Sequence, residues 1–141
     1  MNFEFETIDD WKDYSPIQEA LKELNATSPP DNRLIDGEWN SLILTREKDK
    51  GYPVGFILYN MWEENDEAVW VATYVFPTYR NKGIARLMKL NLAKELDVNK
   101  ICGGIYGKNS PSILSVLGFP EVVIRREGDI FTFEITVNKV E

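Results

Sequence analysis

A turn between an apolar segment and an amphipathic segment carries the residues best suited to chemistry. The stretch VFPTYRNKGIARLMKLNLAKEL, from Val75 to Leu96, begins as a strand, turns at Arg80–Gly83 and continues as a helix. The first N–H groups of a helix have no intrahelical partners and carry partial positive charge. Gly83 would let a ligand approach the backbone closely. The pattern therefore predicts an anion site, with phosphate as the favoured ligand.

Charge is distributed unevenly around this turn. Residues 80–100 have a net charge of +4, which leaves −11 for the rest of a chain whose total is −7. A basic island in an acidic protein indicates a small anion bound locally and a preference for cations elsewhere. The alternative is that the basic residues only cover the exposed face of a helix. The cations of the island are Arg80, Lys82, Arg86, Lys89, Lys94 and Lys100.

Several classes of site are excluded by composition. The chain has no histidine, which removes the usual Ser-His-Asp and Cys-His catalysis and most zinc sites. Cys102 is the only cysteine, so no internal disulfide can form. The glycine patterns of a P-loop and of a Rossmann dinucleotide site are both absent. No secretory signal or membrane-length apolar run is present, so we expect a cytoplasmic protein, with nucleic acid disfavoured as a partner by the acidic balance.

Hydrophobic periodicity predicts the elements that position the turn. Alternation over Phe3–Ile8 indicates a strand, and a helix is expected from Ser15, with Ser15 as its cap, Pro16 in the first position and Gln18 completing a capping box. Further strands are expected at 39–46, 54–62, 68–76, 100–106, 121–126 and 130–137. Two more helices are expected, one after Gly83 and a short one within 110–117. This order predicts one domain over residues 1–141, with a mixed sheet and helices on both faces.

The residues from Val75 to Ala85 resemble the acetyl-CoA signature of the GNAT N-acetyltransferase superfamily. Its core, Arg/Gln-x-x-Gly-x-Gly/Ala after a strand ending Val-x-Pro, is matched by Arg80, Gly83 and Ala85, with Pro77 in place. A later Leu-Gly-Phe at 117–119 is a second mark of the family. The resemblance implies an α/β (mixed α+β) fold. Its mixed, mostly antiparallel sheet of six to seven strands would be flanked by about four helices and would splay between the strands near 68–76 and 100–106.

The resemblance also implies the cofactor and its contacts. Acetyl-CoA would be the cosubstrate, with its pyrophosphate on the turn formed by Arg80, Asn81, Lys82, Gly83, Ile84 and Ala85. Val75 and Phe76 would pair with the pantetheine arm as if it were another strand. Asn109, at the start of the next helix, is a further candidate for contact with coenzyme A. Gly103 and Gly104 suit either the splay or tight packing under a helix.

The resemblance implies direct acetyl transfer from the thioester to a primary amine, and it leaves more than one candidate for the catalytic acid. The position where the family often has a tyrosine acid is Leu114, so Tyr106 or Cys102 could substitute, although both also read as packing residues. Glu67 shares strand parity with Val71, Thr73 and Val75, and is our candidate base. The neighbouring carboxylates match no calcium loop, and we expect no metal.

Two features bear on the acceptor and on alternatives. The acidic remainder favours a cationic amine, such as a polyamine, an aminoglycoside, a lysine side chain or a protein N-terminus. Because the usual acid is missing, a catalytically weakened GNAT-fold protein, acting by binding coenzyme A or a protein partner, is the alternative. Exposed sheet edges also allow a homodimer.

Overall fold

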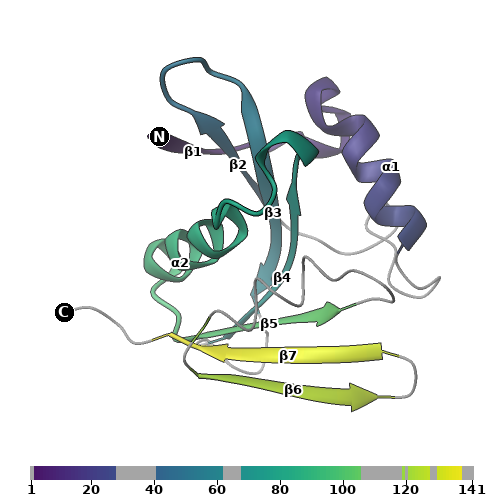
Figure 1. Ribbon diagram of the computed structural model, residues 1–141, viewed down its shortest axis with the longest axis vertical. Coiled ribbons are helices and arrows are strands. Elements are labelled where there is room, and N and C mark those ends of the chain that lie inside the picture. The colour runs from purple at the N-terminus through teal and green to yellow at the C-terminus, as the bar shows by residue number, and fades with distance from the viewer. Residues whose placement is uncertain are drawn as a thin grey trace.

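Seven strands form one sheet in the computed structural model, which describes residues 2–27, 41–61, 68–105, 119, 121–127 and 130–137. The spatial order is β1-β2-β3-β4-β5-β7-β6, with α1 and α2 on opposite faces (Figure 1). The strands are β1 (Phe3–Thr7), β2 (Ser41–Glu47), β3 (Pro53–Met61), β4 (Ala68–Val75), β5 (Lys100–Ile105), β6 (Val122–Glu127) and β7 (Ile130–Thr136). The helices are α1 (Gln18–Thr27) and α2 (Ile84–Leu96), with 3₁₀ turns η1 (Trp11–Asp13), η2 (Ser15–Ile17) and η4 (Pro77–Tyr79).

The sheet is built from two antiparallel blocks that meet along one parallel pair. β1 to β4 are joined by successive antiparallel pairings, and β5, β7 and β6 form the second block. β4 and β5 connect the blocks, with α2 as the crossover between them. The predicted mixed, mostly antiparallel sheet with helices on both faces is therefore confirmed.

Each face of the sheet has its own apolar core. The face toward α2 buries Ile57, Val69 and Ile101 against Leu92 of the helix. The face toward α1 buries Leu42, Leu44, Phe56 and Leu58 against Ile17 and Leu21. Alternate residues of a strand point to opposite faces, so the two helices pack against two separate sets of sheet side chains.

The helices differ from expectation in number and in one start. The described part of the chain holds two α-helices rather than about four, and the helix expected within 110–117 lies outside the described residues. The first helix begins with a 3₁₀ turn at Ser15, and no side-chain cap bond forms there. Gln18 Nε2 instead donates to the carbonyls of Lys12 and Tyr14, at 2.9 Å each, so the expected capping box is wrong.

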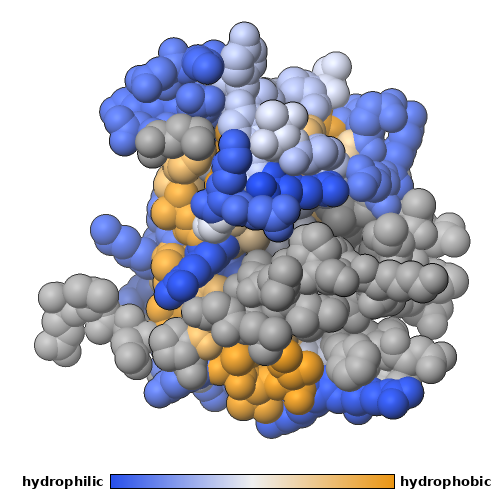
Figure 2. All heavy atoms as spheres, viewed as in Figure 1, coloured by the Kyte–Doolittle hydropathy of each residue, from blue (hydrophilic) through white to orange (hydrophobic). Residues whose placement is uncertain are grey.

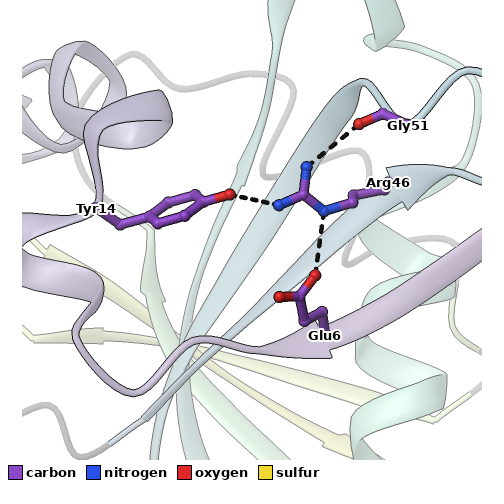
Figure 3. A network of polar contacts seen from close by, with 4 residues as sticks. All are labelled: Glu6, Tyr14, Arg46 and Gly51. Carbon is purple, nitrogen blue, oxygen red and sulfur yellow. Dashed lines mark hydrogen bonds and ion pairs between the residues drawn. The ribbon is translucent and has the colours of Figure 1, made fainter.

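A polar network around Arg46 ties the N-terminal segment to the β2–β3 hairpin (Figure 3). The guanidinium donates to Glu6 Oε2 at 3.2 Å, to the Gly51 carbonyl at 3.2 Å and to the Tyr14 hydroxyl. The N-terminal segment, through Glu6 and Tyr14, and the hairpin, through Gly51, therefore meet at one side chain. This network fixes the segment that leads into α1.

Candidate active site

β4 and β5 separate after a short seam. Their parallel pairing covers only Ala68 to Trp70 of β4 and Lys100 to Cys102 of β5. β4 continues to Val75 and β5 to Ile105, so the edge of β4 from Val71 onward is not paired with β5. The predicted splay is confirmed. At about 3.3 Å per residue, the unpaired edge is roughly 13 Å long.

The direction of the backbone groups on this edge follows from one hydrogen bond. The Phe76 N–H donates to the Val54 carbonyl of β3 at 2.9 Å, so this N–H points toward β3 and away from the splay. Backbone groups alternate along a strand, which turns those of Val71, Thr73 and Val75 toward β5. The pairing of Trp70 with Cys102 uses the Val71 N–H, so the donor and acceptor pairs of Thr73 and Val75 face the opening, together with the Val71 carbonyl. Phe76 contributes its ring instead, 5.4 Å edge-on from that of Tyr74.

The turn after β4 connects this unpaired edge to the N-terminus of α2. Asn81 and Gly83 both adopt left-handed conformations, with φ of 64° and 77°. An alanine would be strained at φ 77°, and nothing lies within 4 Å of a Cβ placed on Gly83. The first helical bond runs from the Leu87 N–H to the Gly83 carbonyl at 3.1 Å, so the preceding N–H groups have no intrahelical acceptor.

Arg80 extends along the unpaired edge from the same turn. Its Nε donates to the Val75 carbonyl at 2.9 Å, and its guanidinium carbon lies 5.4 Å from the centre of the Tyr74 ring. One terminal nitrogen is 3.7 Å from Glu23 Oε1 of α1. The side chain therefore covers part of the edge and links it to the other face of the sheet.

Tyr74 and Glu23 form the polar end of the α1 face. The Tyr74 hydroxyl donates to Glu23 Oε2 at 2.7 Å, and burial, followed by this carboxylate, raises the pKa of Tyr74 to about 12. The phenol therefore stays protonated at neutral pH. The Glu23 side chain is 55% exposed, which leaves its carboxylate reachable by a cation from solvent. No sequence pattern singled out Glu23, because its partners Tyr74 and Arg80 lie far away in the chain.

Close packing marks the point where the two strands part, which we call the vertex. A Cβ on Gly103 would lie 2.7 Å from Phe133 Cζ and 2.9 Å from the Val71 carbonyl oxygen. Gly103 is therefore required by the approach of a ring from β7 and of the β4 backbone. Gly103 and Gly104 were expected to serve either the splay or tight packing. Gly103 serves both, because its tight contact lies at the point where the splay begins.

The face of α2 that packs on the sheet includes a lysine. Ile84, Met88 and Leu92 are buried, whereas Leu87 is exposed. Lys89 is only 1% exposed, and its Nζ lies 5.9 Å from the centre of the Phe133 ring. Burial lowers the pKa of Lys89 to about 8. A basic residue in a helical stripe reads as solvent-facing, so no sequence signal singled it out.

Cys102 is placed as a packing residue. Its side chain is buried, and burial, followed by Glu134, raises the pKa of the thiol to about 11. Nucleophilic cysteines have lowered pKa values and partial exposure, and Cys102 has neither. A catalytic role for this thiol is therefore disfavoured.

The remaining candidates lie outside the described residues. These are Glu67, Tyr106 and Asn109, together with Leu114 at the usual tyrosine position. Among the residues that the structure does describe, no three acidic, cysteine or histidine side chains gather as a metal site. In the same part of the chain, no helix has the length and apolar character needed to cross a membrane.

Comparison with known proteins gives the class. The model of the Acetyltransferase (GNAT) family matches residues 6–105, from β1 through β5. The chain therefore belongs to the GNAT acetyltransferase family, whose enzymes use acetyl-CoA as cosubstrate. The resemblance seen in the 75–85 turn is confirmed. No curated protein matches the chain in sequence.

Solved structures share the fold at low identity. The N-acetyltransferase PseH of Campylobacter jejuni, in complex with acetyl coenzyme A, has a TM-score of 0.62 and 11% identity, over 96% of this chain and 99% of that one. The protein yncA from Salmonella typhimurium, with its cofactor acetyl-CoA, has a TM-score of 0.59 and 18% identity, over 100% and 97%. The ribosomal-protein-S18-alanine N-acetyltransferase of Escherichia coli has a TM-score of 0.60 and 15% identity, over 99% and 97%.

Proposed function

We propose that this chain is an acetyl-CoA-dependent N-acetyltransferase, and that residues 1–141 form one domain that moves the acetyl group directly to a primary amine. The observation that carries the proposal is the unpaired edge of β4, which leads straight into the left-handed turn before α2. A pantetheine chain has about as many bonds as four residues of backbone, roughly 13 Å when extended. It therefore fits the edge from Val75 to Val71, with its pyrophosphate end at the turn.

Coenzyme contacts follow from this placement. The N–H groups of the turn, from Arg80 to Ala85, would hold the pyrophosphate, and the basic side chains of Arg80 and Lys82 would add charge. The amides of pantetheine would pair with the edge groups of Val75 and Thr73. Arg80 must first leave the Val75 carbonyl, which frees its guanidinium for a phosphate. Asn109 remains a proposed additional contact.

The transfer needs an uncharged amine, a polarised thioester and an exit for the thiolate. The amine nitrogen bonds to the acetyl carbon, the C–S bond breaks and the amine loses one proton. Glu67 as base and Tyr106 as acid remain proposals. The backbone N–H of Thr73, turned toward the opening, would polarise the thioester carbonyl as an oxyanion site does.

A cationic acceptor fits the α1 face. Glu23 of α1 is half-exposed and contacts Tyr74 and Arg80 near the end of β4. Four carboxylates that precede it in the chain are also exposed, namely Asp9, Asp10, Asp13 and Glu19. The negative potential of these carboxylates would concentrate a cationic amine on the α1 face of the sheet, opposite α2. Polyamines, aminoglycosides, lysine side chains and protein N-termini all share this chemistry.

A cytoplasmic homodimer is part of the same proposal. β6 is an edge strand, and Val123 and Ile124, which alternation places on opposite faces, are 49% and 37% exposed. Figure 2 shows hydrophobic atoms at the surface over the start of β6. Exposed apolar residues at the start of an edge strand favour pairing with a second copy. Sedimentation of wild type and of Ile124→Lys tests this: a dimer that the variant dissociates is expected, and a wild-type monomer would contradict it.

The coenzyme site is tested by calorimetric titration with acetyl-CoA. Wild type should bind in the micromolar range, and Gly83→Asp should not bind measurably, because it places a carboxylate and a strained backbone in the phosphate turn. Gly51→Asp is the matched control. Gly51 has φ 73° and open space around it, but it lies in the β2–β3 hairpin. The control should lose the same conformational stability and keep acetyl-CoA binding.

The two variants separate a local effect from a general one. Loss of binding in both would trace it to weakened folding and would remove the evidence for the turn. Failure of the wild type to bind acetyl-CoA would refute the proposed function. Binding that Gly83→Asp abolishes would justify assays of cationic amines, with thiol release as the signal.

A further inference from the structure

Arg80 makes two polar contacts that lie on different elements. Its Nε donates to the Val75 carbonyl at 2.9 Å, and a terminal nitrogen lies 3.7 Å from Glu23 Oε1. Its guanidinium carbon lies 5.4 Å from the centre of the Tyr74 ring. Arg80 precedes α2, whereas Glu23 belongs to α1 on the other face of the sheet (Figure 1). One side chain therefore joins the turn before α2, the edge of β4 and the α1 face.

The coenzyme would compete with both contacts of Arg80. The Val75 carbonyl belongs to the unpaired edge, so a pantetheine amide that pairs there takes the place of Arg80 Nε. A pyrophosphate at the turn offers the guanidinium charged oxygens, which bind it more strongly than a neutral carbonyl does. The Arg80 and Glu23 side chains are 35% and 55% exposed, and ion pairs so open to water are weak. Coenzyme binding therefore draws Arg80 away from Glu23.

Tyr74 holds Glu23 in position after Arg80 has left. Its hydroxyl donates to Glu23 Oε2 at 2.7 Å, which is not the oxygen that Arg80 approaches. Burial, followed by this carboxylate, raises the pKa of Tyr74 to about 12, so the phenol remains a donor at neutral pH. The Tyr74 ring is buried and stacks on that of Phe56 at 5.4 Å, which fixes the hydroxyl. Departure of Arg80 therefore leaves an oriented carboxylate whose Oε1 can accept from another cation.

The position of Glu23 suits a second charge on the acceptor. The amine that attacks the thioester must be uncharged, so a carboxylate that attracts a cation recognises another group of the same molecule. If pantetheine follows the edge of β4, the acetyl group lies near Thr73 and Val71. Those residues are roughly 3–10 Å along the strand from Tyr74, beside which Glu23 lies. A short alkyl diamine spans a distance of this size.

From these contacts we infer that Glu23 binds the second cationic group of the acceptor, and that Arg80 withholds this carboxylate until the coenzyme is bound. The inference rests on the proposed function and specifies its acceptor as an amine with a second positive charge, such as a diamine or a longer polyamine. Tyr74 is the positioning residue for the carboxylate. By linkage, the coenzyme tightens acceptor binding and the acceptor tightens coenzyme binding by the same factor.

The first test is the affinity for the diamine cadaverine, measured by calorimetry without and with saturating coenzyme A. Coenzyme A has no acetyl group, so no transfer occurs during the titration. At a salt concentration of about 0.15 M, charges more than about 8 Å apart are largely screened. The energy of an exposed ion pair corresponds to a change in affinity of about two- to fivefold. Cadaverine should bind wild type more tightly by that factor when coenzyme A is bound.

Two variants of α1 assign the effect to Glu23. Glu23→Gln keeps the shape of the side chain and removes its charge, so the gain in cadaverine affinity on coenzyme binding should vanish. Glu19→Gln removes the same charge one turn earlier on the helix, from a side chain that is 94% exposed, and should keep the gain. A gain that Glu23→Gln retains would overturn the inference, because the charge of the coenzyme itself would then explain it.

A second measurement requires no amine. Glu23→Gln leaves Arg80 with one contact fewer, so the variant should bind acetyl-CoA about two- to fivefold more tightly than wild type does. In an Arg80→Gln background, where the family signature also allows glutamine, the same change should leave acetyl-CoA affinity unaltered. If Glu23 only fastened α1 to the sheet, its loss would lower the melting temperature without tightening the coenzyme. Equal tightening in both backgrounds would also overturn the inference.

The second charge of the acceptor is tested by acetyl transfer. Cadaverine and pentylamine have the same carbon chain and differ in one amino group. Thiol release should give wild type a kcat/KM about two- to fivefold higher for cadaverine, and Glu23→Gln should remove this preference. Equal values for the two amines in wild type, or transfer to neither, would overturn the assignment of the acceptor.

The wild type alone decides the matter if Glu23→Gln does not fold. Acetyl-CoA binding together with a cadaverine affinity that coenzyme A does not change would overturn the inference and leave the proposed function in place. Absence of acetyl-CoA binding would overturn both. A gain in cadaverine affinity that Glu19→Gln keeps and Glu23→Gln loses would support Glu23 as the residue that binds the acceptor.

Discussion

Replacing Gly103 by alanine tests the packing at the vertex most directly. The added methyl group would meet Phe133 Cζ at 2.7 Å, Phe133 Cε1 at 2.8 Å and the Val71 carbonyl oxygen at 2.9 Å. Optimal separations between carbon atoms are about 3.5–4.0 Å, so the ring must move by roughly 1 Å. The carbonyl belongs to the backbone of β4 and cannot rotate away. Moving the ring therefore does not relieve the whole overlap.

The expected cost is that of overpacking a core. Such insertions typically destabilise by about 1–3 kcal/mol, which lowers the melting temperature of a chain of this size by roughly 3–12 °C. Urea unfolding followed by circular dichroism measures the free energy directly. Gly51→Ala is the control for glycine loss, because its Cβ meets nothing and its φ of 73° alone should cost about 1–2 kcal/mol.

A second substitution separates the two sources of overlap. Phe133→Leu removes the outer ring atoms, so Gly103→Ala should cost less in its presence, with a coupling of about 0.5 kcal/mol or more. Additive effects would show that the ring does not limit the space at Gly103. A neutral Gly103→Ala would refute the close approach of β5 to Val71, and with it the placement of the vertex.

Three further predictions concern titratable groups. Because the pKa of Tyr74 is raised to about 12 by burial and Glu23, above the value of about 10 in the unfolded chain, the free energy of unfolding should fall as pH rises from about 10 to about 12. Tyr74→Phe should flatten that decline in urea titrations. Because burial lowers the pKa of Lys89 to about 8, Lys89→Met should melt above wild type at pH 7, and scanning calorimetry should show the difference shrinking between about pH 8 and 10.5. Cys102, with its pKa raised to about 11, should react with iodoacetamide at pH 8 at least about tenfold more slowly in the native protein than in denaturant, as mass spectrometry would show; equal rates would contradict its burial.

The helices and strands that follow from hydrophobic periodicity were predictable from the sequence. α2 ends at Leu96 as its apolar spacing indicates, and the strands lie within one or two residues of the expected ranges. The start of α1 was wrong because a capping box is a local pattern, whereas the Gln18 amide responds to carbonyls placed by a 3₁₀ turn. Local sequence cannot distinguish the two geometries at the first turn of a helix.

The candidate site divides in the same way. The phosphate turn was predictable because glycine at a left-handed position and a strand-turn-helix order both leave local marks. The positions of Lys89 and Glu23 were not, since each depends on a partner far away in sequence, Phe133 for one and Tyr74 with Arg80 for the other. A basic residue in an amphipathic helix carries no mark of burial. Its environment is decided by which strands the helix covers.

The three-residue seam between β4 and β5 has a consequence for how the molecule holds together. β1 to β4 and β5 to β6 are each closed by antiparallel pairings, and along the sheet they are joined only at Ala68–Trp70 and Lys100–Cys102 in the described structure. Such a seam lets the two blocks open separately. Within β4, amide exchange should be fastest at Thr73 and Val75, whose N–H groups face the opening. A coenzyme hydrogen-bonded to the unpaired edge of β4 would connect the two blocks. The cosubstrate would then be part of the architecture, and acetyl-CoA concentration would set how firmly the sheet stays closed.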